Sequence, residues 1–217
     1  MLLSGHRPLT EYLARVDHAF MAEPTREQAW ELVCEWVESD SLRKHLLGVE
    51  AAMVGYARRY GEDEERWAVT GLVHDLDYER YPDLETGHPR YALRELARRG
   101  YPQEVIDAVA GHATFLGVPR ETRMAKTLFA VDELSGFIAA CALVRPTGIE
   151  GMKPKSVKKK LKQPSFAAGV NRDEVAQGAE ELGVDFDEHL RTVIAAMEGR
   201  AEELGLSPSA TGGSPGA

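Results

Sequence analysis

The sequence predicts an all-α fold, a helical bundle with a helical extension at its C-terminal end. Apolar residues recur at intervals of three and four through most segments between 25 and 144, which is the helical period. No segment sustains the alternation of apolar and polar residues that marks a strand. The chain has 217 residues, and a fold of this length can bury on the order of 70% of its extended surface.

The expected helices follow one another with short connections. Residues 25–38 and 41–60 form the first two, with N-cap candidates at 39–41 and a stop at Gly61. Pro89 is favourable as the first residue of a helix. The remaining helices are expected at about 64–76, 89–99, 102–113, 121–144, 166–184 and 187–205.

Composition divides the chain into four parts. Residues 1–24 are an N-terminal segment with one possible short helix, and residues 25–150 form the main helical domain. Residues 151–205 contain a lysine-rich segment and two helices that we expect to pack on the core. Residues 206–217 are rich in small residues and are expected to be a disordered tail.

The charge balance is acidic apart from one basic segment. The net charge is −9, and residues 153–162 hold six lysines and no acid, so removing those six charges leaves −15. This balance argues against DNA or RNA as the main partner and leaves a local cationic patch to explain.

The cysteines and the apolar segments indicate a cytoplasmic protein. Cys34 and Cys141 lie in apolar helical patterns without metal-type spacing, so we expect both to be reduced core residues. No leader-like segment opens the chain, and the longest apolar region is interrupted by Asp132 and Glu133. We therefore expect neither a signal peptide nor a membrane partner.

An ordered set of histidines and aspartates predicts a metal site. Asp132 lies in a helix that is apolar nearly all round, and an unpaired buried carboxylate costs several kcal/mol. A cation would satisfy it, and the alternative is a carboxylate that caps a helix or forms a salt bridge. Imidazole nitrogens together with carboxylate oxygens suit Fe, Mn, Co, Ni and Zn. The candidate ligands are His45, His74, Asp75 and Asp132.

Two further histidines lie between Asp75 and Asp132. His88 and His112 would complete a second ion's coordination, with Asp75 as the bridge. The alternatives are a solvated cap-like residue for His88 and a helix-dipole contact for His112. The other histidines are expected at the surface: His6, His18 and His189.

The ordered set resembles the HD superfamily of metal-dependent phosphohydrolases over about residues 25–150. With the two intervening histidines, the pattern is similar to the binuclear branch, which includes bacterial diadenosine tetraphosphate hydrolases and cyclic dinucleotide phosphodiesterases. The resemblance implies that the first ion takes the first histidine, the His-Asp pair and the last aspartate. The second ion takes the bridging aspartate and the intervening histidines.

The implied activity is hydrolysis of a phosphomonoester, phosphodiester or phosphoanhydride of a nucleotide-like small molecule by a hydroxide that two metal ions activate. Asp75 would bridge the ions, and Asp77 would orient a ligand or assist proton transfer. The phosphate also needs a cation, unless the lysines are a solvated helix face. The candidates are Lys155, Lys158, Lys159 and Lys162, with Arg145 and Lys126 in reserve.

Two other functions remain open on the sequence. The same ligand order resembles HD-type mixed-valent diiron oxygenases, which cleave carbon-phosphorus or inositol carbon-carbon bonds. A non-catalytic, metal-stabilised module that binds a nucleotide through the lysine segment is the third possibility.

Overall fold

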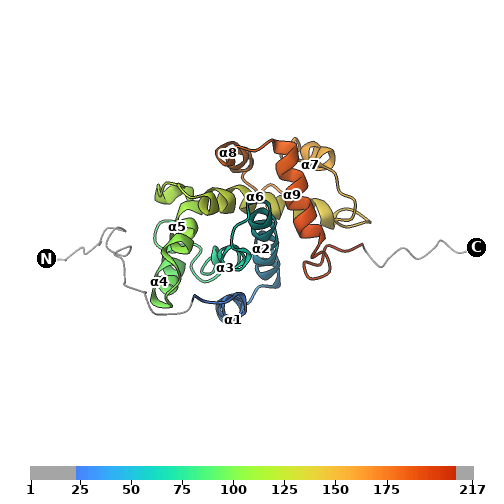
Figure 1. Ribbon diagram of the computed structural model, residues 1–217. Helices are drawn as coiled ribbons and strands as arrows, with labels where there is room; N and C mark the ends of the chain where they lie inside the picture. The colour runs from blue at the N-terminus through green and yellow to red at the C-terminus, as the bar shows by residue number, and fades with distance from the viewer. Residues whose placement is uncertain (1–22, 209–217) are drawn as a thin grey trace, which may run out of the picture.

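The computed structural model describes residues 23–208, and in this part of the chain nine α-helices and a short 3-10 helix form the fold, with no strand. The all-α prediction is therefore confirmed. Helix α2 (Asp40–Tyr60) stands in the middle of the molecule and α6 (Arg123–Leu143) crosses it. Around this pair lie α1 (Arg26–Trp36), α3 (Glu64–Val73), α4 (Arg90–Arg98), α5 (Gln103–His112), the 3-10 helix (Thr114–Leu116), α7 (Pro154–Leu161), α8 (Arg172–Leu182) and α9 (Phe186–Glu198) (Figure 1).

Capping side chains fix where the helices begin. Thr25 and Gln28 form a reciprocal capping box at the start of α1, and the Ser39 hydroxyl accepts from the backbone N–H of Leu42 in α2. Gly61 ends α2 in the left-handed region, with a φ of 69°. The helix expected at 166–184 begins only at Arg172, because the preceding residues form turns and the side chain at 171 caps it.

Helices α2 and α3 pack closely, and this contact positions two of the candidate metal ligands. A Cβ atom at Gly71 would lie 2.7 Å from Glu50 Cα, which is closer than real side chains allow. Glycine therefore lets the two backbones touch. This contact places His74, at the end of α3, beside His45 on α2, and their ring centroids are 5.3 Å apart.

The C-terminal helices share the core of the bundle. Helix α8 lies tightly on α6, because a Cβ at Gly178 would come within 2.6 Å of Ala130 Cα. Leu206, which the sequence assigned to the tail, is buried, and its carbonyl accepts a hydrogen bond from Ile149 N–H (2.9 Å). The core residues from this region are Val157, Val175, Leu190, Val193, Ile194, Met197, Leu204 and Leu206.

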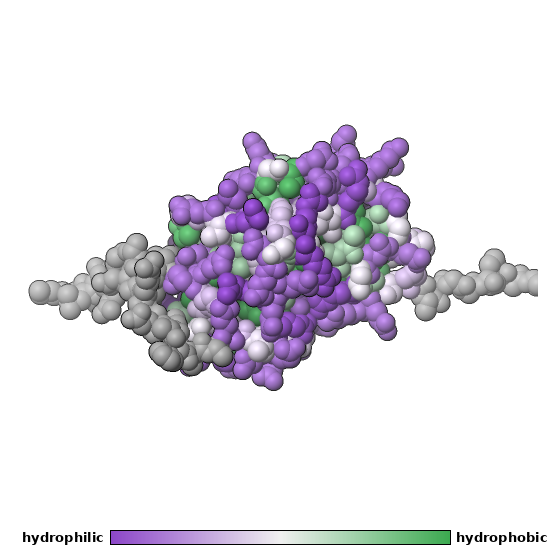
Figure 2. Space-filling view, in the orientation of Figure 1, coloured by the Kyte–Doolittle hydropathy of each residue, from purple (hydrophilic) through white to green (hydrophobic). Residues whose placement is uncertain are grey.

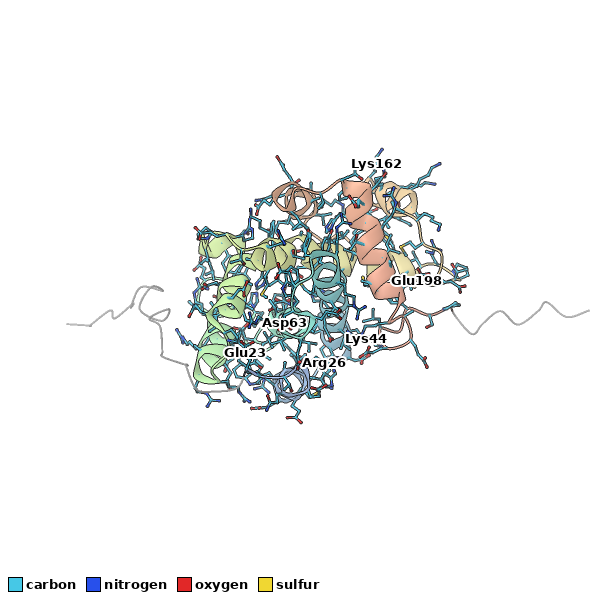
Figure 3. The ribbon with its side chains drawn as sticks, viewed as in Figure 1. Glu23, Arg26, Lys44, Asp63, Lys162 and Glu198 are labelled. Atoms are coloured by element: carbon cyan, nitrogen blue, oxygen red, sulfur yellow. The ribbon has the colours of Figure 1, made fainter. Side chains whose placement is uncertain are left out.

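An ion-pair network around the buried Glu50 of α2 joins α1 to the residues that follow α9. Glu50 is 3% exposed and accepts from Arg26 Nε at 2.7 Å, while Arg200 Nη1 lies 2.9 Å from its other oxygen. Figure 3 labels Arg26 on α1, at the bottom of the view. Two arginines satisfy one carboxylate that would otherwise be costly to bury.

Two expectations from the sequence are wrong. His189 is fully buried rather than at the surface, since Tyr56 Oη lies 2.5 Å from its Nδ1 and its Nε2–H donates to the Ala130 carbonyl. Cys34 is exposed on α1, whereas Cys141 is buried as expected. His6, His18 and the possible short N-terminal helix lie outside the described residues.

The visible surface is largely hydrophilic. Figure 2 shows smaller hydrophobic areas near the top of the view and on its right side. Among residues 23–208, no helix is long and apolar enough to cross a membrane.

Candidate metal centre

Six side chains that the sequence singled out converge on one cleft. They come from three helices and one connection, because His45 lies on α2, Asp132 on α6 and His112 at the end of α5. His74 and Asp75 follow the last residue of α3, and His88 lies just before α4. The ligand atoms form two groups, each within 4.8 Å: His45, His74 and Asp132, and Asp75, His88 and His112.

The first group is built around one carboxylate oxygen of Asp132. Its Oδ1 lies 3.1 Å from His45 Nε2 and 3.3 Å from His74 Nε2. Asp75 joins this group through Oδ2, which is 3.6 Å from His74 Nε2 and 3.9 Å from His45 Nε2. The four ligands expected for a first ion therefore face one another.

The second group is built around the other oxygen of Asp75. Its Oδ1 lies 3.4 Å from His88 Nε2 and 3.3 Å from His112 Nε2. The two oxygens of one carboxylate thus point to two different histidine pairs. This is the arrangement that a bridging ligand requires.

These spacings match those of atoms that share an ion. Two ligand atoms that each lie about 2.1 Å from an ion are about 3.0 Å apart at a right angle and about 3.4 Å apart in a tetrahedron. Five of the six histidine-to-carboxylate distances, at 3.1–3.6 Å, fall close to this range, and the sixth, between His45 and Asp75, is longer at 3.9 Å.

Hydrogen bonds behind three of the imidazoles fix the tautomer. His74 Nδ1 donates to the Gly71 carbonyl (2.8 Å), and His112 Nδ1 donates to the Val109 carbonyl. His88 Nδ1 donates to Asp77 Oδ1 at 2.8 Å. With the proton held on Nδ1, each Nε2 presents a lone pair to the centre of the cleft, as a metal ligand must.

The Nε2 lone pairs of the histidines face the carboxylate oxygens of the aspartates and would repel them, so a positive charge between the two is favourable. Burial alone would lower the pKa of His74, but the carboxylates of Asp75 and Asp132 outweigh it and raise that pKa to about 9. Burial opposes ionisation of the two aspartates as well, yet the neighbouring histidines hold both of their pKa values well below the ordinary range. The side chains thus attract a cation strongly, and the donor set fits divalent transition ions.

The cleft around these ligands has a volume of about 470 Å³ and holds residues that the sequence did not single out. Tyr78 and Phe115 are both 46% exposed on its lining, so two rings are available to a ligand. Burial and the charge of Asp132 raise the pKa of Glu133, on the same lining, to about 7. Glu133 could have been noticed as the neighbour of Asp132 on α6, whereas no local motif marks Tyr78 or Phe115.

Asp77 lies behind the cleft rather than in it. The residue is fully buried, and its second oxygen accepts from Ala92 N–H at 2.8 Å, so both oxygens are occupied. Of the two roles expected for it, the geometry supports orientation of His88 and leaves no access for proton transfer to a substrate.

The lysine segment is not part of the cleft lining. It forms α7, whose Val157 is buried in the core, and Lys158 Nζ pairs with Asp187 Oδ1 on α9 at 2.6 Å. Helix α7 packs on α9 and none of its lysines lines the cleft, so the roles expected for them have no geometric support. Within residues 23–208, the cleft lining contains no arginine and no lysine, and the excluded candidates are Lys155, Lys158, Lys159, Lys162, Arg145 and Lys126.

Comparison with protein families gives one match. Residues 42–136 match the HD domain, and this range contains all six candidate ligands. No curated protein and no solved structure gives a significant match to the chain.

Proposed function

We propose, because residues 42–136 match the HD domain, that the protein is a hydrolase that uses two divalent transition-metal ions to cleave a phosphate ester of a small, nucleotide-like molecule. The observation that carries the proposal is the position of Asp75, whose two oxygens face two separate histidine pairs. A single ion would leave one of these pairs without a function.

The protein residues divide the work as follows. His45, His74 and Asp132 would hold the first ion, and His88 and His112 the second, with Asp75 between them. When bound, the ions supply a water of lowered pKa and neutralise negative charge on the phosphoryl oxygens. The chain itself fixes the ligands, because the Nδ1 hydrogen bonds prevent three imidazoles from rotating or changing tautomer.

The cleft favours a substrate of low phosphate charge. Its described lining has no arginine or lysine and carries the carboxyl groups of Glu133 and Glu174 in addition to the ligands. A triphosphate would meet these groups without a compensating cation, whereas one phosphate would be neutralised at the ions. The rings of Tyr78 and Phe115 offer stacking surfaces for a base or another planar group.

The test is a hydrolysis screen of metal-loaded protein. The apoprotein is reloaded anaerobically with Mn or Co and assayed for phosphate release from nucleoside monophosphates and simple phosphodiesters. We expect turnover that Asp75→Asn abolishes and that Asp107→Asn, the same change outside the cleft on α5, leaves intact.

The outcome also separates hydrolysis from oxygenase chemistry. Activity that requires iron and consumes O₂, with no turnover in Mn or Co, would contradict hydrolysis and favour a diiron oxygenase. Tight nucleotide binding without product would favour a non-catalytic module.

A further inference from the structure

A second pocket begins beside the metal centre and extends away from it. This apolar pocket, of about 440 Å³, lies between α2, α6, α9 and the residues that follow α9. His45 and Gly136 line both this pocket and the metal cleft. Figure 3 labels Lys44 on α2 and Glu198 at the end of α9, which lie on the side of the molecule where the pocket's elements meet.

Gly136 lies where the two spaces adjoin. A Cβ there would lie 3.8 Å from His45 Nδ1, so any larger side chain would occupy the space between α6 and the imidazole. The same imidazole is a candidate ligand of the first ion. A group bound in the apolar pocket would therefore lie next to a phosphate held at the metal centre.

The lining specifies the chemistry of the occupant. It consists mostly of small or apolar residues, and its charged members, Asp40 and Lys44, pair with each other at 2.7 Å. Leu143, at the end of α6, lines the pocket and is 71% exposed. Binding of an uncharged apolar group in the pocket would remove this apolar surface from water, which is favourable. The apolar lining includes Gly48, Ala139, Ala140, Leu143, Met197 and Leu204.

An unpartnered hydroxyl also indicates a ligand. Ser135 lines the pocket, is 1% exposed, and its Oγ has no hydrogen-bond partner among the described residues. A buried polar atom of this kind is costly unless something satisfies it. An occupant that brings one hydrogen-bonding atom into the pocket would do so.

We propose that the pocket between α2, α6 and α9 is a specificity subsite for an uncharged, mainly apolar substituent of the phosphate ester that the metal centre binds. The proposal rests on the proposed function and deepens it, because it adds an apolar group to the substrate class. Ala140 is the residue best placed to test it, since it lines the pocket without lining the metal cleft.

The experiment measures binding rather than turnover. The affinities of n-alkylphosphonates, from methyl to hexyl, are determined by calorimetry with the metal-loaded full chain. Burial of each methylene should strengthen binding roughly three- to fourfold. Ala140→Leu should weaken hexylphosphonate at least about tenfold and leave methylphosphonate unchanged, because roughly three methylenes lose their space. Ala176→Leu, at an exposed position on α8, is the matched control.

The possible failures are distinct. If methylphosphonate binds in a metal-dependent way but affinity does not rise with chain length, the subsite is refuted while the proposed function stands. If no phosphonate binds to protein that holds its metal, the proposed function fails and the subsite with it. If affinity rises with the length of the alkyl chain only after residues 209–217 are deleted, the protein's own terminus competes for the pocket, and this result also overturns the proposal.

Discussion

Replacing Asp77 by asparagine should weaken binding of the second ion and leave binding of the first ion unchanged. The Asp77 carboxylate accepts from two donors, His88 Nδ1 and Ala92 N–H, each at 2.8 Å. Asparagine has nearly the same shape but only one acceptor oxygen, so its NH₂ group must face one of these donors. If it faces His88, the ring is driven to carry its proton on Nε2, where the ion would bind.

The magnitude follows from the contact that is lost. A hydrogen bond to a charged group contributes about 1.5–3 kcal/mol, and each 1.4 kcal/mol is about tenfold in affinity. We therefore expect the Kd of the second ion to rise about 10- to 100-fold, in line with other partners of metal-bound histidines. His74 and His45 make no contact with Asp77, so the first ion should keep its affinity.

The assay is a competitive chelator titration that resolves the two binding steps, with Co or Mn as the ion. Asp107→Asn serves as the control, because Asp107 makes a hydrogen bond to Gln103 on α5 and does not line the cleft. An equal loss of affinity for both ions, or no change in either affinity, would refute the conclusion that Asp77 orients His88.

Three further changes have expected outcomes. His88→Ala combined with His112→Ala should lower the metal content from about two ions per chain to about one while circular dichroism stays helical, and an unchanged content would leave both histidines without a metal role. Glu50→Ala leaves Arg26 and Arg200 with only the more exposed carboxylate of Glu203 and should cost about 3 kcal/mol of unfolding free energy. Glu203→Ala leaves both arginines paired with the buried Glu50 and should cost less than about 1 kcal/mol. Equal losses in denaturant titrations would count against the buried network. Burial lowers the pKa of His189 to about 4. Between about pH 4 and 6.5 the unfolded chain therefore binds more protons than the folded chain. The free energy of unfolding should fall by on the order of 3 kcal/mol as the pH drops through this window. His189→Gln should flatten that slope, and identical slopes for the two proteins would be inconsistent with a neutral buried imidazole.

The candidate ligand set could be proposed from the sequence because two of its features carry a local signal and the ordered pattern resembles the HD superfamily. Asp132 is a carboxylate in an apolar helix, and His74 and Asp75 are adjacent at a helix end. A metal explains both features, so the residues could be grouped without coordinates. The pairing of His88 with Asp77 could not be read in the same way, because it depends on how the connection at residues 74–89 folds back.

The misplaced residues share a physical cause. The lysine segment was assigned to the cleft from its charge and helical spacing, but its helix packs on α9, Val157 is buried, and Lys158 pairs with Asp187. His189 was assigned to the surface because it lacks a nearby acid in sequence. Its partners, Tyr56 and Ala130, lie more than fifty residues away along the chain and become visible only in the folded structure.

The bridging position of Asp75 is the central claim, and anomalous diffraction from crystals of the metal-loaded protein tests it most directly. We predict two ion peaks, one beside Asp75 Oδ2 with His45, His74 and Asp132, and one beside Asp75 Oδ1 with His88 and His112. A single peak at full metal occupancy, or two peaks that do not share Asp75, would contradict the binuclear centre.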